Sequence, residues 1–223
     1  MNLALVGYGK MGKLLEQLAP QAGFKVTARI DIGEDLGAAK DADVAIEFTQ
    51  PEAAVANIER LASLGVPVVC GTTGWLAELP RVRDVVDRAG TALVWSPNFS
   101  IGVNVFTRLV ADASKLLASE ADYGAWAWEI HHSTKKDAPS GTLLQLVEAM
   151  KSAGYRRPID MSSSRAGVHP GTHEIGFDSA ADTITLRHTA RSREGFARGA
   201  LKAAQWVIGK RGVFEFSEVL FGR

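Results

Sequence analysis

The sequence predicts an α/β protein whose first hundred residues form a doubly wound parallel sheet and whose second half is α+β. Two observations support this fold class. Up to residue 95, short apolar runs alternate with helix-like segments of about a dozen residues, which is the pattern of βαβ units. After Ser96-Pro-Asn98 the rhythm changes, and strand-like pieces are separated by Gly, Pro and Asp. We therefore expect a parallel sheet followed by a part with antiparallel strands.

Each element of the first half follows from a local pattern of apolar residues and turn formers. Short buried strands are expected over residues 3–6, 25–30, 44–48, 66–70 and 91–95. Helical apolar spacing is expected over residues 13–22, 52–64 and 76–88. Pro51 fits the first turn of the second of these helices.

The second half mixes longer helices with alternating strands. Helices are expected over residues 103–117, 142–153 and 196–208. Residues 125–132 alternate with period two and predict a strand, and strand-like pieces near 161–165, 172–177 and 183–189 are expected to be antiparallel. A short apolar tail through Phe214 and Val219 follows the last helix.

Composition excludes several classes of protein. Lys plus Arg is 25 and Asp plus Glu is 25, so the formal net charge is zero, and neither a nucleic-acid partner nor a membrane partner is expected. The single cysteine, Cys70, excludes an internal disulfide framework and a multi-cysteine zinc site, and no metal is expected. The opening residues lack a signal-type stretch, and no apolar run approaches the roughly 18–20 residues of a membrane span. We expect a cytoplasmic protein.

A glycine-rich turn follows the first predicted strand and opens a helix. Gly7, Gly9 and Gly12 have the spacing of a Rossmann-type dinucleotide site, in the required strand–turn–helix context. The first glycine permits the tight turn, the second lets the backbone approach the pyrophosphate, and the third allows close packing of helix and strand. Asp31 stands at the end of the second strand, where it can accept both hydroxyls of an adenosine ribose.

Asp31 favours NADH over NADPH, because a carboxylate repels a 2′-phosphate. Arg29 and Lys10 are the nearest cations that could weaken this preference, so use of both cofactors stays open. Gly71-Thr-Thr-Gly74 ends another strand of the same sheet, at the edge where ligands bind in such folds.

The densest polar segment runs from Glu129 to Thr142. Ser140 is a suitable N-cap, so Gly141 and Thr142 are expected as the first helical residues, where free amides and the helix dipole favour an anion. Lys135 and the histidines just upstream can supply positive charge and a proton donor. The segment therefore indicates an anionic substrate, such as a carboxylate, that gains a proton.

This segment resembles the signature of the 4-hydroxy-tetrahydrodipicolinate reductase (dihydrodipicolinate reductase) family of lysine and diaminopimelate biosynthesis. The family's pattern is two histidines, two variable residues, Lys, one variable residue and Asp-Ala-Pro-Ser-Gly-Thr. His131-His132, Lys135 and Asp137–Thr142 match all of it. The resemblance continues at residues 7–12, 47–49 with Pro51, 71–74, 97–100 with 102–104, and 171–173, so it spans nearly the whole chain.

The resemblance implies a reaction and a set of roles. The family transfers a hydride from NADH or NADPH to C4 of an unsaturated dicarboxylate ring, after or with loss of water. His131 is implied as the proton donor and Lys135 as the group that stabilises the developing negative charge. The residues implied in substrate binding are His132, Ser140, Gly141 and Thr142. Those implied in cofactor binding are Gly7, Tyr8, Gly9, Lys10, Met11, Gly12, Asp31, Phe48, Gly71, Thr72, Thr73, Ser96, Pro97, Asn98 and Phe99.

The resemblance also implies a domain layout. The dinucleotide-binding domain is expected over residues 1–99 and 194–223, with the substrate-binding and oligomerisation domain, residues 100–193, inserted between them. The sheet of the inserted domain usually builds a homotetramer in this family. Ile32 stands where members that grip NADPH often carry arginine, which puts NADPH preference in doubt. Arg193, just before the last helix, could close on the substrate or lie at a hinge surface.

Two other readings remain open. Another two-domain NAD-dependent oxidoreductase, such as an aspartate or homoserine dehydrogenase, would share the glycine turn but would need its own catalytic residues. A non-catalytic NAD-binding sensor would lack a poised acid, yet His131 and Lys135 are both present. Both readings predict nucleotide binding, so turnover is what separates them.

Overall fold

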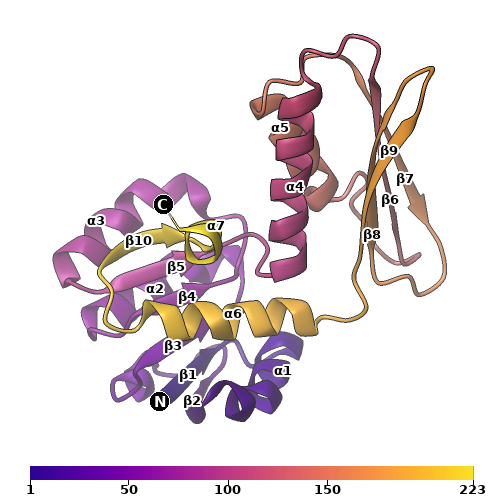
Figure 1. Cartoon of the computed structure of the whole chain (residues 1–223). Coiled ribbons are helices and arrows are strands. Elements are labelled where there is room, and N and C mark those ends of the chain that lie inside the picture. Colours follow the sequence, from indigo (N-terminus) through magenta and orange to yellow (C-terminus); the bar gives the residue numbers. More distant parts are fainter. Residues whose placement is uncertain (223) are drawn as a thin grey trace. The chain divides into compact units, whose positions relative to one another are not determined.

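The computed structural model describes residues 1–222, which form two compact units (Figure 1). The first unit comprises residues 1–101 and the segment from residue 193 onward, and the second comprises residues 102–192. These bounds lie close to the division expected at residues 99 and 194. Each unit has its own sheet and its own hydrophobic core.

The first unit is built on a six-stranded parallel sheet. Its strands are β1 (Asn2–Val6), β2 (Lys25–Ile30), β3 (Val44–Glu47), β4 (Val68–Cys70), β5 (Ala92–Trp95) and β10 (Gly212–Glu215). Their order across the sheet is β10-β5-β4-β3-β1-β2, so the direction of winding reverses between β1 and β3. Ligands of such sheets bind at this switch point, beyond the carboxyl ends of the strands. The glycine turn that follows β1 therefore lies where a dinucleotide is expected.

Helices cover both faces of this sheet, which confirms the doubly wound fold. The helices are α1 (Lys10–Leu18), α2 (Pro51–Ser63), α3 (Leu79–Ala89), α6 (Glu194–Val207) and α7 (Phe216–Phe221), with short 3₁₀ turns at Ala19–Ala22, Leu36–Ala39 and Leu76–Glu78. Leu3 and Leu5 of β1 pack in the core formed with α1 and α6, whereas Ala4 and Val6 pack in the core formed with α2 and α3. No helix within residues 1–222 is long and apolar enough to cross a membrane.

Two local predictions for this unit need correction. The first helix begins at Lys10 and not at residue 13, so Gly12 lies in its first turn, packed against the backbone of Gly7. The apolar tail contains a strand and a helix, β10 and α7, that the sequence analysis left unassigned. In β10 only Val213 is buried, so the strand has too little apolar pattern to be recognised alone.

The second unit contains a mixed four-stranded sheet with the order β7-β6-β8-β9. Its strands are β6 (Gly124–His131), β7 (Ile159–Arg165), β8 (Thr172–Asp178) and β9 (Thr183–Thr189). β8 is antiparallel to both β6 and β9, as expected. β7, however, runs parallel to β6, so the antiparallel prediction for residues 161–165 is wrong. The reason is the helical crossover between β6 and β7, since parallel neighbours need a long connection, usually a helix.

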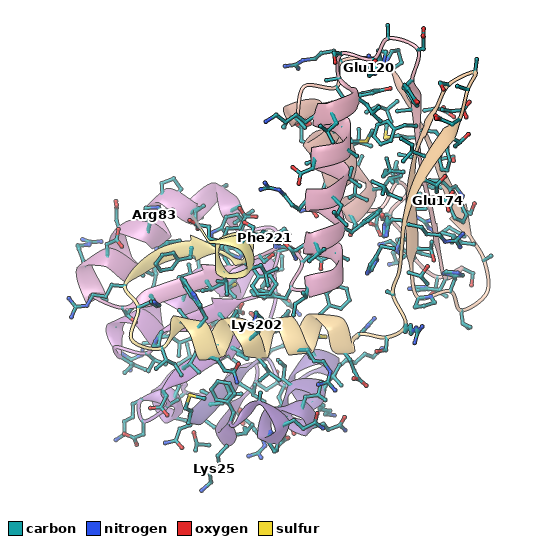
Figure 2. The ribbon with its side chains drawn as sticks, viewed as in Figure 1. Lys25, Arg83, Glu120, Glu174, Lys202 and Phe221 are labelled. Carbon is teal, nitrogen blue, oxygen red and sulfur yellow. The ribbon has the colours of Figure 1, made fainter. Side chains whose placement is uncertain are left out.

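Two helices pack on one face of this sheet, α4 (Ile101–Leu117) and α5 (Gly141–Ser152). The core between these helices and the sheet includes Val110, Leu146 and Ile175. Figure 2 draws the side chains of this unit as sticks. Because side chains alternate along a strand, the neighbours of buried Ala125 and Ala127 lie on the other face. This second face presents two tryptophans of β6, Trp126 and Trp128.

Candidate active site

Two cavities of the first unit lie at the carboxyl ends of β1, β3, β4 and β5. The larger, about 420 Å³, is lined by Gly9, Lys10, Met11, Phe48, Thr49, Pro51, Gly71, Thr72 and Thr73. The smaller, about 220 Å³, is lined by Met11, Phe48, Gly71, Ser96, Pro97, Asn98, Phe99, Arg193 and Phe196. Most of the residues expected to bind the cofactor therefore line two cavities that share Met11, Phe48 and Gly71. Arg193 joins this set as a wall of the smaller cavity.

The three glycines of the turn have different surroundings. Gly7 has a φ of +92°, and a Cβ there would overlap the carbonyl of Phe48. Gly12 packs against the backbone of Gly7. Gly9, by contrast, has no atom within 4 Å of where a Cβ would lie. Gly7 and Gly12 therefore shape the turn, whereas Gly9 leaves open backbone beside the larger cavity, which suits the approach of a pyrophosphate.

Asp31 lies at the end of β2 in a third cavity of about 240 Å³. Glu34 lines the same cavity, and its Oε2 accepts a hydrogen bond of 2.7 Å from the Asp31 amide. The Ile32 amide donates to Asp31 Oδ1 at 3.0 Å. Two carboxylates thus stand in this cavity, and Glu34 is a residue that the sequence does not single out.

Tyr8 does not line any of these three cavities. Its hydroxyl donates to the carboxylate of Glu16, and this hydrogen bond raises the pKa of Tyr8. Glu16 also forms an ion pair with Arg29, whose hydrogen bond lowers the pKa of the Glu16 carboxyl. The Tyr8 side chain, which was expected to contact the cofactor, therefore points to Glu16. Arg29 is paired with the same Glu16 and not with Asp31.

Glu47 is a buried carboxylate beneath the cavities, and the sequence analysis assigned it no role. Its Oε1 accepts hydrogen bonds from the Thr49 amide at 3.1 Å and from the Thr49 hydroxyl, and its Oε2 accepts one of 3.0 Å from the thiol of Cys70. The Thr49 amide also donates a hydrogen bond of 2.8 Å to the Thr72 hydroxyl oxygen. Burial and the charge of Glu47 raise the pKa of Cys70 well above its usual value, so this thiol stays protonated. Glu47 therefore links Thr49, which lines the larger cavity, to the end of β4 at Cys70.

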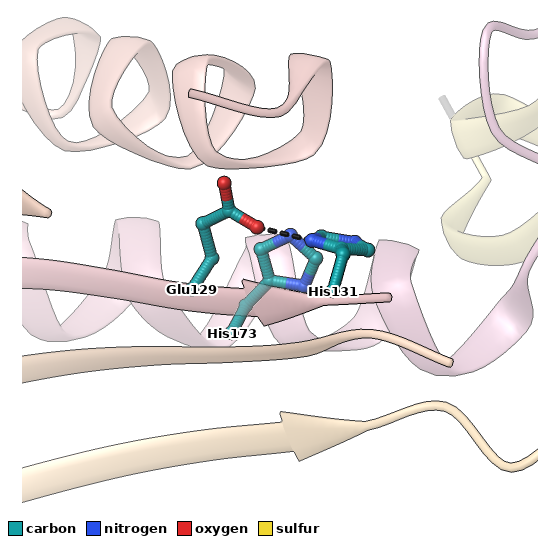
Figure 3. Close-up of side chains that lie close together, drawn as sticks. All are labelled: Glu129, His131 and His173. Carbon is teal, nitrogen blue, oxygen red and sulfur yellow. Dashed lines mark hydrogen bonds and ion pairs between the residues drawn. The ribbon is translucent and has the colours of Figure 1, made fainter. Parts of the chain in front are cut away.

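A second polar cluster lies inside the second unit, on the face of the sheet that α4 and α5 cover. It contains Glu129 and His131 of β6 and His173 of β8 (Figure 3). Glu129 and His173 are register partners, and the rings of His131 and His173 meet edge to face with centroids 5.1 Å apart. Nδ1 of His131 is hydrogen-bonded to Oε2 of Glu129.

Glu129 is fully buried and is held by groups from several segments. Its Oε1 accepts hydrogen bonds from Arg165 Nη2 at 2.8 Å and from the Ser140 amide at 3.1 Å. Burial alone would raise the pKa of Glu129, but the bonds from Arg165, Ser163, His131 and the Ser140 amide together lower it. Glu129 is therefore ionised at neutral pH. Arg165 balances the charge of this carboxylate inside the unit.

The two histidines of the cluster both favour the neutral state. Burial lowers the pKa of His131, and the positive charges of Lys135 and Arg165 act in the same direction against the opposing effect of Glu129. Burial and the nearby His131 lower the pKa of His173 to about 4. Nε2 of His173 is hydrogen-bonded to the hydroxyl of Ser140 at 3.1 Å. His173 therefore acts as a neutral hydrogen-bonding partner at pH 7.

The N-terminus of α5 has the predicted form. Ser140 is the N-cap, with an extended backbone, and its hydroxyl accepts a hydrogen bond of 3.2 Å from the Leu143 amide. Helical structure begins at Gly141, as expected. A Cβ at Gly141 would meet no atom within 4 Å, so the first turn of the helix is open. The amides of Gly141 and Thr142 can therefore take part in binding an anion.

The other two candidate residues lie in or beside the loop that leads from β6 to α5. Lys135 Nζ donates a hydrogen bond of 2.6 Å to Asp137, and this bond lowers the pKa of the Asp137 carboxyl. His132 is hydrogen-bonded through Nδ1 to the Thr134 hydroxyl at 2.8 Å and is not part of the buried cluster. The structure thus brings His131, Lys135 and Ser140 to one end of the second unit's sheet, with His132 directed to its own loop.

Comparison with known proteins identifies the family. Residues 1–99 match the sequence model of the N-terminal part of dihydrodipicolinate reductase, and residues 102–220 match that of its C-terminal part. The chain belongs to the dihydrodipicolinate reductase family. Membership makes the protein a nicotinamide-dependent oxidoreductase and agrees with the Rossmann-type fold of the first unit.

Relatives of this family match along their whole length. A 4-hydroxy-tetrahydrodipicolinate reductase of Christiangramia forsetii is 36% identical over 233 residues, which cover 99% of this chain and 98% of the relative. One of Archaeoglobus fulgidus is 35% identical over 261 residues, which cover 99% of this chain and 100% of the relative. The solved structure of a dipicolinate-bound dihydrodipicolinate reductase from Paenisporosarcina sp. TG-14 superposes with a TM-score of 0.83 at 18% identity, covering 96% of this chain and 97% of that one. That likeness confirms the fold.

Dihydrodipicolinate reductase signature residues form only part of the buried cluster. Arg165 and His173 come from β7 and β8, and the sequence analysis gave neither a role. His173 could have been found from its place in the matched Gly171-Thr-His173 segment, and Glu129 from its position two residues before His131, on the same face of the strand. No local pattern points to Arg165, because its partner is Glu129 on a neighbouring strand.

Proposed function

We propose that the protein reduces 4-hydroxy-tetrahydrodipicolinate to tetrahydrodipicolinate, with NADH or NADPH as the reductant. The observation that carries this proposal is the full-length likeness, at 35–36% identity, to reductases named for that reaction. The buried His131–Glu129 pair, next to an open helix N-terminus, supports it. Such a site suits a small carboxylate that receives a proton.

The residues of the second unit supply the proton and the charge stabilisation. Loss of water, made from the C4 hydroxyl and a proton of the neighbouring ring carbon, leaves a conjugated imine. A bound cofactor would supply a hydride to C4 of this ring, and the ring anion so formed takes up one proton. His131 donates the proton, and Lys135 stabilises negative charge that develops on the ring. The amides of Gly141 and Thr142 hold a substrate carboxylate at the N-terminus of α5.

The direct test is the loss of reduced-nicotinamide absorbance with substrate generated in situ. Rapid oxidation is expected with the substrate and none without it. If the protein binds NADH but does not oxidise it when the substrate is supplied, the reductase assignment is contradicted. It would favour the alternative of a non-catalytic nucleotide-binding protein.

We propose a preference for NADH that rests on two carboxylates. Asp31 and Glu34 line the cavity at the end of β2, where the adenosine ribose is expected. A 2′-phosphate there would meet two negative charges, so kcat/KM is expected to be at least about tenfold higher with NADH than with NADPH. In the Asp31→Ser variant this ratio should fall by about tenfold or more, because one repulsive charge is gone.

The matched control for this prediction is Asp35→Asn. Asp35 lies close in sequence, but its carboxylate caps the 3₁₀ turn at Leu36–Ala39 and does not line the cavity. Asparagine is also a good cap, so the cofactor ratio should stay the same. Equal use of both cofactors by the unchanged protein would contradict the proposed role of the carboxylate pair.

We further propose that the protein is a homotetramer, built through the second face of the mixed sheet. Trp126 lies against the backbone of Gly176 on this face. Trp128 lies beside it, with its Nε1 donating to Ser164 at 3.2 Å and its ring 6.0 Å from the Arg187 guanidinium. Flat aromatic surface of this kind is typical of subunit interfaces.

Light scattering after gel filtration tests the assembly. The unchanged protein is expected at four times its 23.9 kDa chain mass. Trp128→Glu should lower the mass to that of a smaller species, because it places a charge in the interface core. Leu144→Glu serves as the control, since Leu144 lies exposed on α5, away from this face. A monomeric unchanged protein at micromolar concentration would refute the proposal.

A further inference from the structure

We propose that Glu129 is the positioning residue of the proton donor: it fixes the proton of His131 at Nδ1 and leaves Nε2 to deliver a proton to the substrate. Three features of the cluster carry this inference, namely the ionisation of Glu129, its rigid fixation and the identity of the nitrogen it binds. The inference rests on the proposed role of His131 for its kinetic consequence, but its structural content can be tested without any substrate.

The bond from Glu129 fixes the tautomer of His131. An ionised carboxylate can only accept hydrogen bonds. Glu129 Oε2 is bonded to Nδ1 of His131, so Nδ1 must carry a proton in both the neutral and the charged imidazole. The imidazolium therefore gives up the proton of Nε2, and the product of the transfer is the Nδ1–H tautomer without any rotation of the ring.

The ring of His131 is held in position from two sides. Glu129 Oε1 is held at the same time by Arg165 and by the amide of Ser140, so the carboxylate has little freedom to move. On the other side of the ring, Nε2 lies beside Gly171, where a Cβ would come within 2.9 Å of it. His131 is thus fixed between a clamped carboxylate and a glycine. Glu129 also connects the proposed proton donor to Ser140, because the same carboxylate binds His131 and the Ser140 amide. Ser140 is the N-cap of the helix that is expected to hold the substrate carboxylate.

Charged and titratable groups surround His131. Four elements contribute charged or titratable groups: Glu129 on β6, Lys135 in the following loop, Arg165 on β7 and His173 on β8. Arg165 neutralises the carboxylate, so the ion pair does not hold the proton on His131 too tightly. Removing Glu129 and removing Arg165 should therefore shift the titration of His131 in opposite directions.

The experiment is a pH titration of the full chain labelled with ¹⁵N-histidine, followed by long-range ¹H–¹⁵N spectra. These spectra report the tautomer and the titration midpoint of each of the five histidines, and His131→Gln identifies the signal. Above its midpoint, His131 is expected as the Nδ1–H tautomer. An Nε2–H tautomer in the unchanged protein would overturn the proposal, and this measurement needs no variant that might unfold.

Two variants test the charge balance. In Glu129→Gln the midpoint of His131 should fall by about one pH unit or more, because a negative charge is lost while Arg165 remains. In Arg165→Gln the midpoint should rise, because the positive charge is lost. The matched control is Glu174→Gln: Glu174 pairs with Arg187 at 3.2 Å and neighbours His173 on the opposite face of β8, so the midpoint should not move. An unmoved midpoint in Glu129→Gln would overturn the proposal.

The kinetic readout separates positioning from a merely structural effect. The limb of kcat/KM that requires a protonated group should shift to lower pH in Glu129→Gln by the same amount as the midpoint of His131. A general structural loss would instead lower kcat/KM equally at every pH. If the protein proves not to be this reductase, the spectra still decide the role of Glu129. If the protein is the reductase but the pH dependence of kcat/KM does not shift with the midpoint of His131, then His131 is not the proton donor. The role of Glu129 in fixing the tautomer of His131 is not affected by that result.

Discussion

His131→Ala is expected to lower kcat for reduction of 4-hydroxy-tetrahydrodipicolinate by about 100-fold or more, because a positioned general acid contributes about 10²–10⁴-fold. Lys135→Ala is expected to cause a loss of similar size, since it removes a positive charge that acts on the proposed proton donor. Neither side chain lines a cavity of the nucleotide unit, so NADH affinity should be unchanged. Steady-state rates and a fluorescence titration with NADH measure the two quantities.

Lys136→Ala is the matched control for this pair. Lys136 neighbours Lys135 in the same loop and is exposed, so its removal should leave kcat near that of the unchanged protein. Near-normal turnover by His131→Ala would show that another group delivers the proton. Equal losses in Lys135→Ala and Lys136→Ala would mean that the loop contributes only general positive charge.

Gly9→Ala and Gly7→Ala are expected to fail in different ways. A methyl group at Gly9 meets no atom in the protein, so the free energy of unfolding should change little, but the methyl projects beside the groove and should weaken NADH binding by about tenfold or more. A methyl group at Gly7 overlaps the carbonyl of Phe48 at a φ of +92°, so unfolding should become easier by at least about 2 kcal/mol.

Urea denaturation and NADH titration of both variants test this separation. The expected pattern is a stable Gly9→Ala protein that binds NADH poorly and a destabilised Gly7→Ala protein. If Gly9→Ala bound NADH normally, the pyrophosphate would not approach this part of the turn. A Gly7→Ala protein of unchanged stability would mean that the strand end of Phe48 can move aside.

The buried parallel strands β1, β3 and β5 could be predicted from sequence because both of their faces are apolar, and the predicted bounds differ from those found only at the strand ends. The predicted bounds of β2 are those found, although β2 is an edge strand with three exposed residues. The direction of β7 was predicted wrongly. This strand is rich in serine and largely exposed, and its direction is set by the α5 crossover. β10 was missed because a four-residue strand at the edge of a sheet carries almost no local pattern.

Part of the candidate site could also be predicted, because His131, Lys135 and Ser140 lie in one short segment with a helix start. The buried partners could not, since a carboxylate such as Glu129 acquires its role only when another strand brings Arg165 to it. The same limit applies to Glu34, whose bond to the Asp31 amide depends on the turn between them.

The return of the chain to the nucleotide unit has a consequence for biosynthesis. Residues 102–192 are continuous and can complete their own core as soon as they leave the ribosome, whereas the first unit lacks α6 and β10 until the last segment is made. Until then, the sheet face that buries Leu5 and Ile46 has no α6 to cover it. We therefore expect the inserted unit to fold first during synthesis, and the nascent N-terminal sheet to depend on chaperone protection until its C-terminal helix arrives.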